Sequence, residues 1–148
     1  MTNGHVSIVR RSLEVFDHII IAIARDSGKN PLFSLEERVS MVQKIFQNNS
    51  RVTVESFSGL LVEYVHGRGV NTIIRGLRAV SDFEYEFQMA LMNRKLNPNI
   101  HTIFMMTDYK WLYISSTIIK DVARLGGSID GLVPESVATQ VRERLAQA

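Results

Sequence analysis

The chain lacks cysteine, so neither a disulfide framework nor a thiolate metal site is possible. Long hydrophobic runs are also missing: the longest, Ile19 to Ala24, is far too short to span a bilayer, and no signal peptide precedes it. Neither sign of charge is in large excess, because the 17 Lys and Arg residues nearly balance the 15 Asp and Glu residues. The basic residues also form no stripe of the kind that binds nucleic acid. We therefore expect a cytoplasmic protein with neither a membrane nor a nucleic acid as partner.

What is present is ordinary for a globular chain, with 45% hydrophobic and 22% charged residues. The 148 residues suffice for one domain with a real core, and no repeat, low-complexity tract or linker divides them. We therefore predict a single domain over residues 1–148.

Short apolar runs alternate with segments of helical periodicity. Strands are predicted at Ile19 to Ala24, Arg51 to Ser56, Asn71 to Arg75 and His101 to Met106. Helices are predicted over Gly4 to Asp17, Ser34 to Asn48, Leu60 to His66 and Ser81 to Leu96, from Ser115 or Ser116 to Gly126, and from Pro134 onward. This alternation predicts an α/β fold with a parallel sheet covered by helices on both faces, the first run being a strand buried on both sides. Ligands in such folds bind at the carboxyl ends of the strands.

The segment Thr2-Asn3-Gly4-His5 stands at the head of the first predicted helix. A helix N-terminus offers unpaired amides that bind phosphate, the glycine permits close approach, and His5 could donate to a phosphoryl oxygen. Taken alone, such a pair is more typical of a polar helix cap.

A second segment, Ile74-Arg75-Gly76-Leu77-Arg78, follows a predicted strand. Two arginines flanking a glycine can hold two phosphates, or one phosphate and a base. A surface turn with solvated arginines fits this segment equally well.

In a third segment, from Trp111 to Thr117, three hydroxyl residues lead into a helix. Their side chains and free amides could receive a polyphosphate, with Trp111 as an apolar wall for a base, whereas simple capping needs only one hydroxyl. Elsewhere, Lys29 could reach a phosphate from its loop, and Glu86 could face ligand or solvent. The methionines Met89, Met92, Met105 and Met106 are predicted to fill the core.

Together these segments resemble bacterial pantetheine-phosphate adenylyltransferase, of the T/H-x-G-H nucleotidyltransferase superfamily. The resemblance runs the length of the chain. It rests on T-N-G-H (2–5), F-S-L-E-E-R (33–38), I-R-G-L-R-A (74–79), D-F-E-Y-E (82–86) and W-x-x-I-S-S-T (111–117).

The resemblance implies a Rossmann-like fold and transfer of the adenylyl group of ATP to 4′-phosphopantetheine. The products are dephospho-coenzyme A and pyrophosphate, in coenzyme A biosynthesis. It also implies Mg²⁺, coenzyme A as a further ligand, and a homohexamer. The acceptor phosphate attacks ATP directly, so no protein nucleophile is needed, and no metal-ligating residue is expected on the protein.

In the family, the residue matching His5 stabilises the transition state, and we expect Lys29 and Arg78 to share in catalysis by cancelling charge. The residues matching Lys29, Leu61 and Arg75 contact phosphopantetheine. Those that bind ATP match His5, Gly76, Leu77, Arg78, Glu86, Trp111, Leu112, Tyr113, Ile114, Ser115, Ser116 and Thr117.

One departure concerns the first strand of the family's sheet and a loop of the type Tyr-Pro-Gly-Thr-Phe-Asp-Pro, which precede T-N-G-H in the family and are missing here. Neighbouring strand edges should then be unpaired, unless another element fills the gap or a native segment precedes Met1. This keeps open a catalytically impaired protein that binds ATP or coenzyme A. A further alternative is a related nucleotidyltransferase acting on another phosphorylated acceptor.

Overall fold

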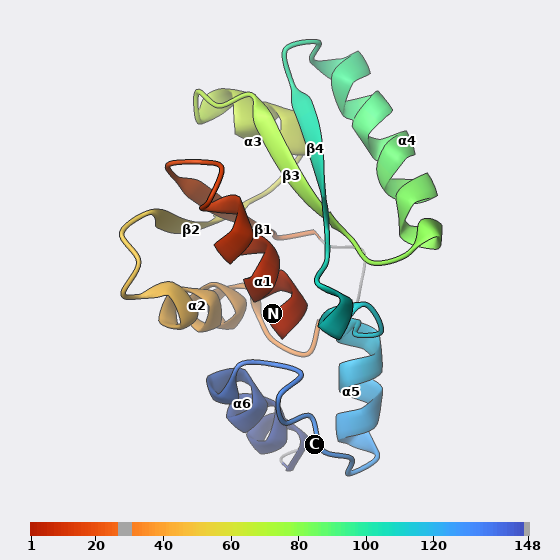
Figure 1. The fold of residues 1–148 in the computed structure, drawn as a ribbon. Helices are drawn as coiled ribbons and strands as arrows, with labels where there is room; N and C mark the ends of the chain where they lie inside the picture. The colour runs from red at the N-terminus through yellow and green to blue at the C-terminus, as the bar shows by residue number, and fades with distance from the viewer. Residues whose placement is uncertain (27–30, 147–148) are drawn as a thin grey trace.

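A computed structural model describes residues 1–26 and 31–146 of the chain (Figure 1). The strands within these ranges are β1 (Ile19–Ala24), β2 (Val52–Phe57), β3 (Thr72–Leu77) and β4 (His101–Met106). The helices are α1 (Asn3–Ser12), α2 (Leu35–Phe46), α3 (Leu61–Gly67), α4 (Val80–Leu96), α5 (Ser116–Arg124) and α6 (Glu135–Ala146), with a short 3-10 turn η1 (Tyr109–Trp111). The predicted alternation of strands and helices is confirmed.

Local signals in the sequence explain several of the helix ends. Ser34 and Glu37 form a capping box, in which the Glu37 N–H donates to Ser34 Oγ at 3.2 Å and the Ser34 N–H donates to the Glu37 carboxylate at 2.7 Å. The first helix, predicted to reach Asp17, ends at Ser12, where the chain turns toward β1. The Ser12 hydroxyl donates to the Ile8 carbonyl at 2.8 Å, and such back-bonding weakens a helix.

The strands form two parallel pairs instead of the single sheet that the alternation predicts. Ile19 pairs with Val52 in the β1–β2 sheet, and Thr72 pairs with His101 in the β3–β4 sheet. Within residues 1–26 and 31–146, no strand pairs with the second edge of β1 or of β3, in line with the expected unpaired edges. The prediction that β1 is buried on both faces is wrong: its six residues are only half-buried, because a strand in a two-stranded sheet is an edge strand.

Helix α1 lies against both strand pairs and so connects them. On one side, Val6, Val9 and Leu13 pack with residues of α2, β1 and β2. On the other side Ile8 meets Gly76 of β3, where a Cβ atom would lie only 3.2 Å from Ile8 Cγ1. Arg11 also donates to the carbonyl of Met106 at the end of β4. The backbone at Gly76 therefore approaches α1 more closely than a larger residue would permit.

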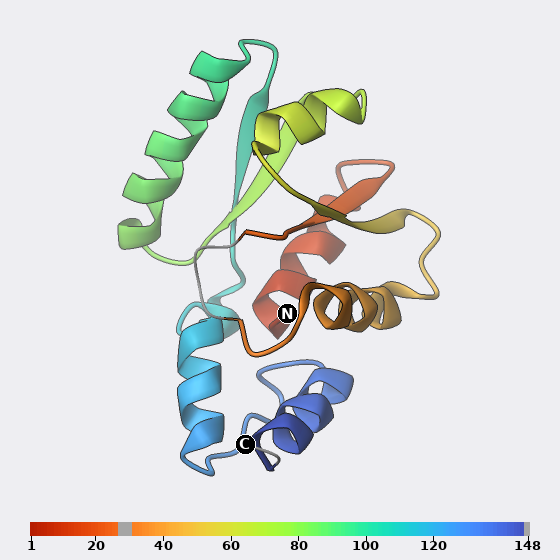
Figure 2. The same ribbon diagram turned by 180° about the vertical axis from the view of Figure 1, so that it is seen from behind.

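A second core cluster joins α2, α5 and α6 below the strands (Figures 1 and 2). Its buried residues are Met41, Ile114, Ile119, Ile129, Val133, Val137, Ala138 and Val141. The loop before α6 also holds the start of α1, because the Asn3 N–H donates to the Leu132 carbonyl at 3.0 Å. No helix in the described part of the chain is long and apolar enough to cross a membrane.

The methionines expected in the core are mostly at the surface. Met89, Met92 and Met106 are 41%, 54% and 61% exposed, whereas Met105 is half-buried with its sulfur 3.2 Å from the Ser12 hydroxyl. The prediction was therefore wrong for three of the four. For Met89 and Met92 the reason lies in α4, whose half-buried face carries polar side chains and leaves its apolar flanks outside, whereas Met106 is the last residue of β4.

Candidate functional site

The three segments singled out in the sequence meet at the carboxyl ends of β3 and β4. A Cβ atom at Gly4 would lie 3.3 Å from Trp111 Cβ and 3.6 Å from Thr107 Cγ2. One at Gly76 would lie 3.9 Å from Thr107 Oγ1. The start of α1, the end of β3 and the chain after β4 therefore share one small region. Parallel strands and the helices that follow them produce this convergence in α/β folds.

His5 lies in the first turn of α1, and its ring is held by Thr2. Its Nδ1 accepts from the Thr2 backbone N–H at 3.2 Å and lies 2.8 Å from the Thr2 hydroxyl. A backbone N–H can only donate, so the neutral ring carries its proton on Nε2. This orients Nε2–H as a hydrogen-bond donor for a ligand.

The charge state of His5 is set by its surroundings. Although part of the residue is exposed to solvent, neighbouring protein crowds the ring, and burial is the leading cause that lowers the pKa of His5 to about 4. The positive charges of the N-terminal ammonium, Arg78 and Arg75 act in the same direction. At neutral pH His5 is therefore an uncharged donor.

Arg78 connects three elements of the site. Its Nε and Nη2 donate to the two carboxylate oxygens of Asp82 in the first turn of α4, at 2.9 and 3.1 Å. Its Nη1 donates to the Ile114 carbonyl just before α5, at 2.9 Å. The hydrogen bonds from Arg78 are the largest cause that lowers the pKa of Asp82. Arg78 is therefore positioned, half-buried, beside the helix end predicted to receive ATP.

Arg75 forms a forked pair with Glu86. Its Nε and Nη2 donate to the two carboxylate oxygens of Glu86, each at 2.6 Å. These hydrogen bonds are the largest cause that raises the pKa of Arg75. The two residues were predicted to contact different substrates, whereas here they hold each other. An incoming phosphate must therefore compete with Glu86 for the guanidinium.

The segment from Trp111 to Thr117 divides into structural and open residues. Ile114 is 4% exposed, and Ser115 caps α5 by accepting the Ile118 N–H at 3.1 Å. Capping therefore uses one hydroxyl, while Ser116 and Thr117 in the first turn are exposed. Leu112 and Tyr113 are 41% and 66% exposed. The α5 N-terminus thus presents hydroxyls and backbone amides of the kind that bind phosphate.

Comparison with known proteins agrees with this geometry. The cytidylyltransferase-like family profile matches residues 1–122. A phosphopantetheine adenylyltransferase of Nitratidesulfovibrio vulgaris (strain DP4) is 60% identical over 144 residues, which are 97% of this chain and 77% of the relative. The chain belongs to the phosphopantetheine adenylyltransferase family. Relatives with the same name from Solidesulfovibrio magneticus and Geobacter metallireducens are 60% and 50% identical, over 100% and 99% of this chain and 86% and 90% of their own lengths.

Two residues that the family resemblance assigns to substrates lie differently from the rest. Leu61 begins α3 after β2 and packs at the edge of the cluster of Val62, Val65, Ile73 and Ile100. Leu77 is 7% exposed, so its backbone, not its side chain, is what a ligand can meet. Lys29 lies outside the described residues.

The structure also brings residues to the site to which the sequence assigned no role. Thr107 is 8% exposed, lies near Gly4 and Gly76, and donates its N–H to the Leu77 carbonyl at 2.8 Å. Asp82 holds Arg78, and Thr2 holds the ring of His5. The available signals were the place of Thr107 directly after a strand and the four-residue spacing from Arg78 to Asp82.

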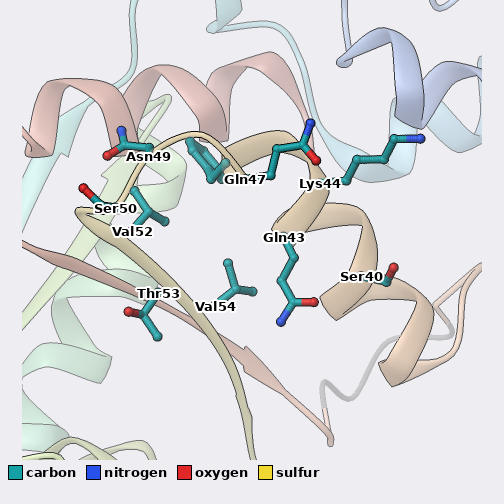
Figure 3. A pocket seen from close by; sticks show the side chains of 10 residues that line it. Ser40, Gln43, Lys44, Gln47, Asn49, Ser50, Val52, Thr53 and Val54 are labelled. Carbon is teal, nitrogen blue, oxygen red and sulfur yellow. The ribbon is translucent and has the colours of Figure 1, made fainter.

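Hollows on the surface do not by themselves identify this site. A shallow hollow of about 610 Å³ lies between α2 and β2 and is lined by amides and hydroxyls such as Gln43, Gln47 and Thr53 (Figure 3). None of the converging segments lines it. A second hollow of about 660 Å³ runs beside α1 and borders the site through Asn3, Asp108 and Trp111. The convergence of side chains is therefore the better guide.

The described ranges contain no group of three or more His, Cys, Asp or Glu side chains that could hold a metal ion. The two carboxylates nearest the arginines, Asp82 and Glu86, are each paired with one of them. Mg²⁺ usually keeps several waters and takes substrate phosphates as ligands, so a site of this kind is compatible with an ion that arrives on ATP.

Proposed function

We propose that this chain transfers the adenylyl group of ATP to 4′-phosphopantetheine, giving dephospho-coenzyme A and pyrophosphate in coenzyme A biosynthesis. The observation that carries the proposal is the convergence of the T-N-G-H helix start, Arg78 and the α5 N-terminus at the ends of β3 and β4. Family membership adds independent support, because relatives of that name are up to 60% identical over nearly the whole chain.

In the proposed reaction, a phosphate oxygen of 4′-phosphopantetheine attacks the α-phosphorus of ATP. The bond from the α-phosphorus to the bridging oxygen breaks, pyrophosphate leaves with that electron pair, and a new phosphoanhydride forms. No protein nucleophile takes part. The protein acts by positioning the reactants and stabilising charge on the transferring group.

His5 is the proposed transition-state stabiliser. Its Nε2–H, fixed by the hydrogen bond from Thr2 to Nδ1, donates to an oxygen of the α-phosphoryl group. Because the ring is neutral at physiological pH, it donates this hydrogen bond without first breaking an ion pair. It also needs no new proton after each turnover.

The arginines divide between the two substrates in this proposal. Arg78 and the exposed α5 N-terminus hold the phosphates of ATP, together with the backbone at Gly76 and Leu77. The stretch Trp111 to Thr117 supplies the wall for the nucleotide. Arg75 holds the phosphate of phosphopantetheine, with Lys29 and Leu61 along the same substrate. Glu86, released from Arg75, binds ATP.

The remaining features are proposed on the same basis. Mg²⁺ is carried by the phosphates of ATP, where it neutralises charge, and the chain's own residues bind and orient the complex. The protein works in the cytoplasm as a homohexamer, and coenzyme A, which shares the phosphopantetheine group, is a further ligand. It has neither a membrane nor a nucleic-acid partner.

The experiment that tests the proposal is a pyrophosphate-release assay with ATP and 4′-phosphopantetheine, beside pantetheine that lacks the phosphate. We expect release of pyrophosphate only with the phosphorylated acceptor. Its phosphate is both the group that Arg75 binds and the nucleophile of the reaction. Release with an unrelated phosphorylated acceptor would favour a different nucleotidyltransferase. Binding of ATP without any release would favour the catalytically impaired binder.

A further inference from the structure

Helix α4 lies along the outer flank of the molecule, beyond β4 (Figures 1 and 2). It contacts the rest of the chain through a face that carries Asp82, Glu86, Ala90 and Asn93, all half-buried. Two of these side chains are held by the ion pairs with Arg78 and Arg75. A mainly polar contact face leaves the apolar side chains of the helix outside.

One outer strip of α4 is formed by Phe83, Phe87 and Leu91, spaced four residues apart and therefore on one side of the helix. These side chains are 44%, 45% and 54% exposed. Phe83 stacks on Phe87 with ring centroids 5.6 Å apart and meets Phe104 of β4 edge-on at 5.8 Å. The strip is therefore an ordered apolar surface continuous with the edge of the β3–β4 sheet.

Opposite charges stand at the two ends of this strip. Glu84 lies near its start and Lys95 near its end, and eleven residues make about three helical turns, so both lie on the same side of the strip. Both residues are exposed, and none of the ion pairs found in the described chain includes either. Along the helix, the midpoint between Glu84 and Lys95 nearly coincides with the midpoint between Phe87 and Leu91.

This pattern is complementary to itself. If a second copy of α4 lies antiparallel on the first, Phe87 of each copy meets Leu91 of the other, and Glu84 of each meets Lys95 of the other. A two-fold contact requires such a self-complementary surface. The three apolar side chains offer roughly 300 Å² per copy. That is a large part of the apolar core in a standard interface of about 800 Å² per partner, whose rim is polar.

We propose that two copies of this chain associate through an antiparallel pairing of α4, with Phe87 against Leu91 at the centre and Glu84 against Lys95 at each end. The pairing names a contact surface for the homo-oligomer proposed above and rests on self-association of the chain. It is independent of the adenylyl-transfer reaction, so the two proposals are separable by experiment.

The test measures the mass of the full chain in solution by light scattering after size-exclusion chromatography. Leu91→Glu places a charge at the centre of the contact and should weaken association at least about tenfold, a penalty of about 1.4 kcal/mol. Tyr85→Glu is the matched control: Tyr85 is on the same helix, 63% exposed and outside the strip. Its mass should equal that of the unaltered chain. A monomeric unaltered chain, or an unchanged mass for Leu91→Glu, would overturn the proposal.

Charge reversal tests the direction of the pairing. Glu84→Lys should weaken association, and Glu84→Lys combined with Lys95→Glu should restore it, because each end again joins opposite charges. Failure of the double variant to recover would rule out the antiparallel register. Pyrophosphate release, measured on the same samples, reports the enzymatic proposal separately: an assembling but inactive chain would contradict only that proposal.

Disulfide trapping gives a direct readout because the chain has no cysteine of its own. Phe87→Cys mixed with Leu91→Cys should form a crosslinked dimer of the two variants under mild oxidation. Either variant alone should crosslink much less, since two copies of the same position are offset along the pair. Equal crosslinking of each variant with itself would contradict the antiparallel register.

Discussion

The two strand pairs of this protein differ in how the helices beside them are attached. The β1–β2 pair is covered by a buried apolar cluster that includes Val9 of α1 and Phe46 of α2. The β3–β4 pair also has a buried apolar cluster, formed with α3, but its other helix, α4, is held by the ion pairs Arg75–Glu86 and Arg78–Asp82 as well as by a ring contact to β4. Apolar packing therefore holds both halves together, whereas the half that carries the site also keeps charged groups that substrates can recruit.

This difference has an energetic consequence. Exposed ion pairs contribute about 0–1 kcal/mol each, and truncating a large buried side chain costs about 3–5 kcal/mol. The site half can therefore rearrange its charges on ligand binding at little cost to folding.

The largest effect on stability is expected at Phe46, which is 8% exposed in the β1–β2 half. Phe46→Ala should lower the free energy of unfolding by about 3–5 kcal/mol, because it leaves a cavity in the cluster. Phe83→Ala, on α4 of the other half and 44% exposed, should lower it by less than about 1.5 kcal/mol. Urea unfolding followed by circular dichroism measures both. Equal losses would contradict the contrast.

The next effect concerns the close approach of α1 to β3. Gly76→Ala should destabilise the protein by about 1–3 kcal/mol, since the new Cβ would lie 3.2 Å from Ile8 Cγ1. Gly67→Ala is the matched control, because nothing lies within 4 Å of a Cβ there and its backbone is helical. That variant should be neutral or slightly stabilising. If the two variants unfold at the same urea concentration, α1 does not depend on a glycine at this contact.

A smaller effect on stability, with a kinetic signature, is expected at Glu86. Glu86→Gln should lower stability by no more than about 1 kcal/mol, because the Arg75 side chain is 45% exposed and solvent screens the pair. Without the carboxylate, Arg75 no longer has to exchange partners, so the KM for 4′-phosphopantetheine should fall while the KM for ATP rises. Glu63→Gln, at an exposed position on α3, is the control. A KM for phosphopantetheine that rises instead would show that Glu86 helps to bind that substrate.

The last effect is a pH dependence of stability from His5, which solvent at the exposed part of the residue reduces. Its pKa in the folded protein, about 4, is below the ordinary value of 6.5, so between these values the unfolded chain binds a proton that the folded chain does not. The resulting stability is complete above pH 6.5 and is lost as the pH falls from 6.5 toward 4. His5→Asn should reduce the slope of unfolding free energy against pH in this range. An identical slope in both proteins would show that His5 titrates normally.

Much of the architecture could be predicted from the sequence because its local signals are strong. The β-branched run Ile19 to Ala24 and the strand His101 to Met106 occur at the predicted bounds, and the box of Ser34 and Glu37 begins α2 as expected. The division into two strand pairs could not be read from periodicity, since periodicity describes each strand but not which strands become neighbours.

The candidate site could be predicted as three segments but not as a network. Spacing along the chain places Arg75 and Arg78 at the end of a strand, but it cannot show that Glu86 and Asp82 hold them. The prediction that the α4 methionines fill the core was wrong for the same reason. Methionine is a core residue by type, yet Met89 and Met92 face outward because polar partners of the arginines occupy the inner face.

The most direct test of the account is the steady-state rate of pyrophosphate release with ATP and 4′-phosphopantetheine, for the chain as it stands and for His5→Ala. Loss of one preorganised donor to the transferring group should lower kcat by about 100- to 1,000-fold. The affinity for ATP, measured by calorimetry, should be nearly unchanged, and His66→Ala, an exposed histidine on α3, should retain full activity. An unchanged kcat for His5→Ala would contradict the role of His5. No release by the unaltered chain would contradict the proposed reaction itself.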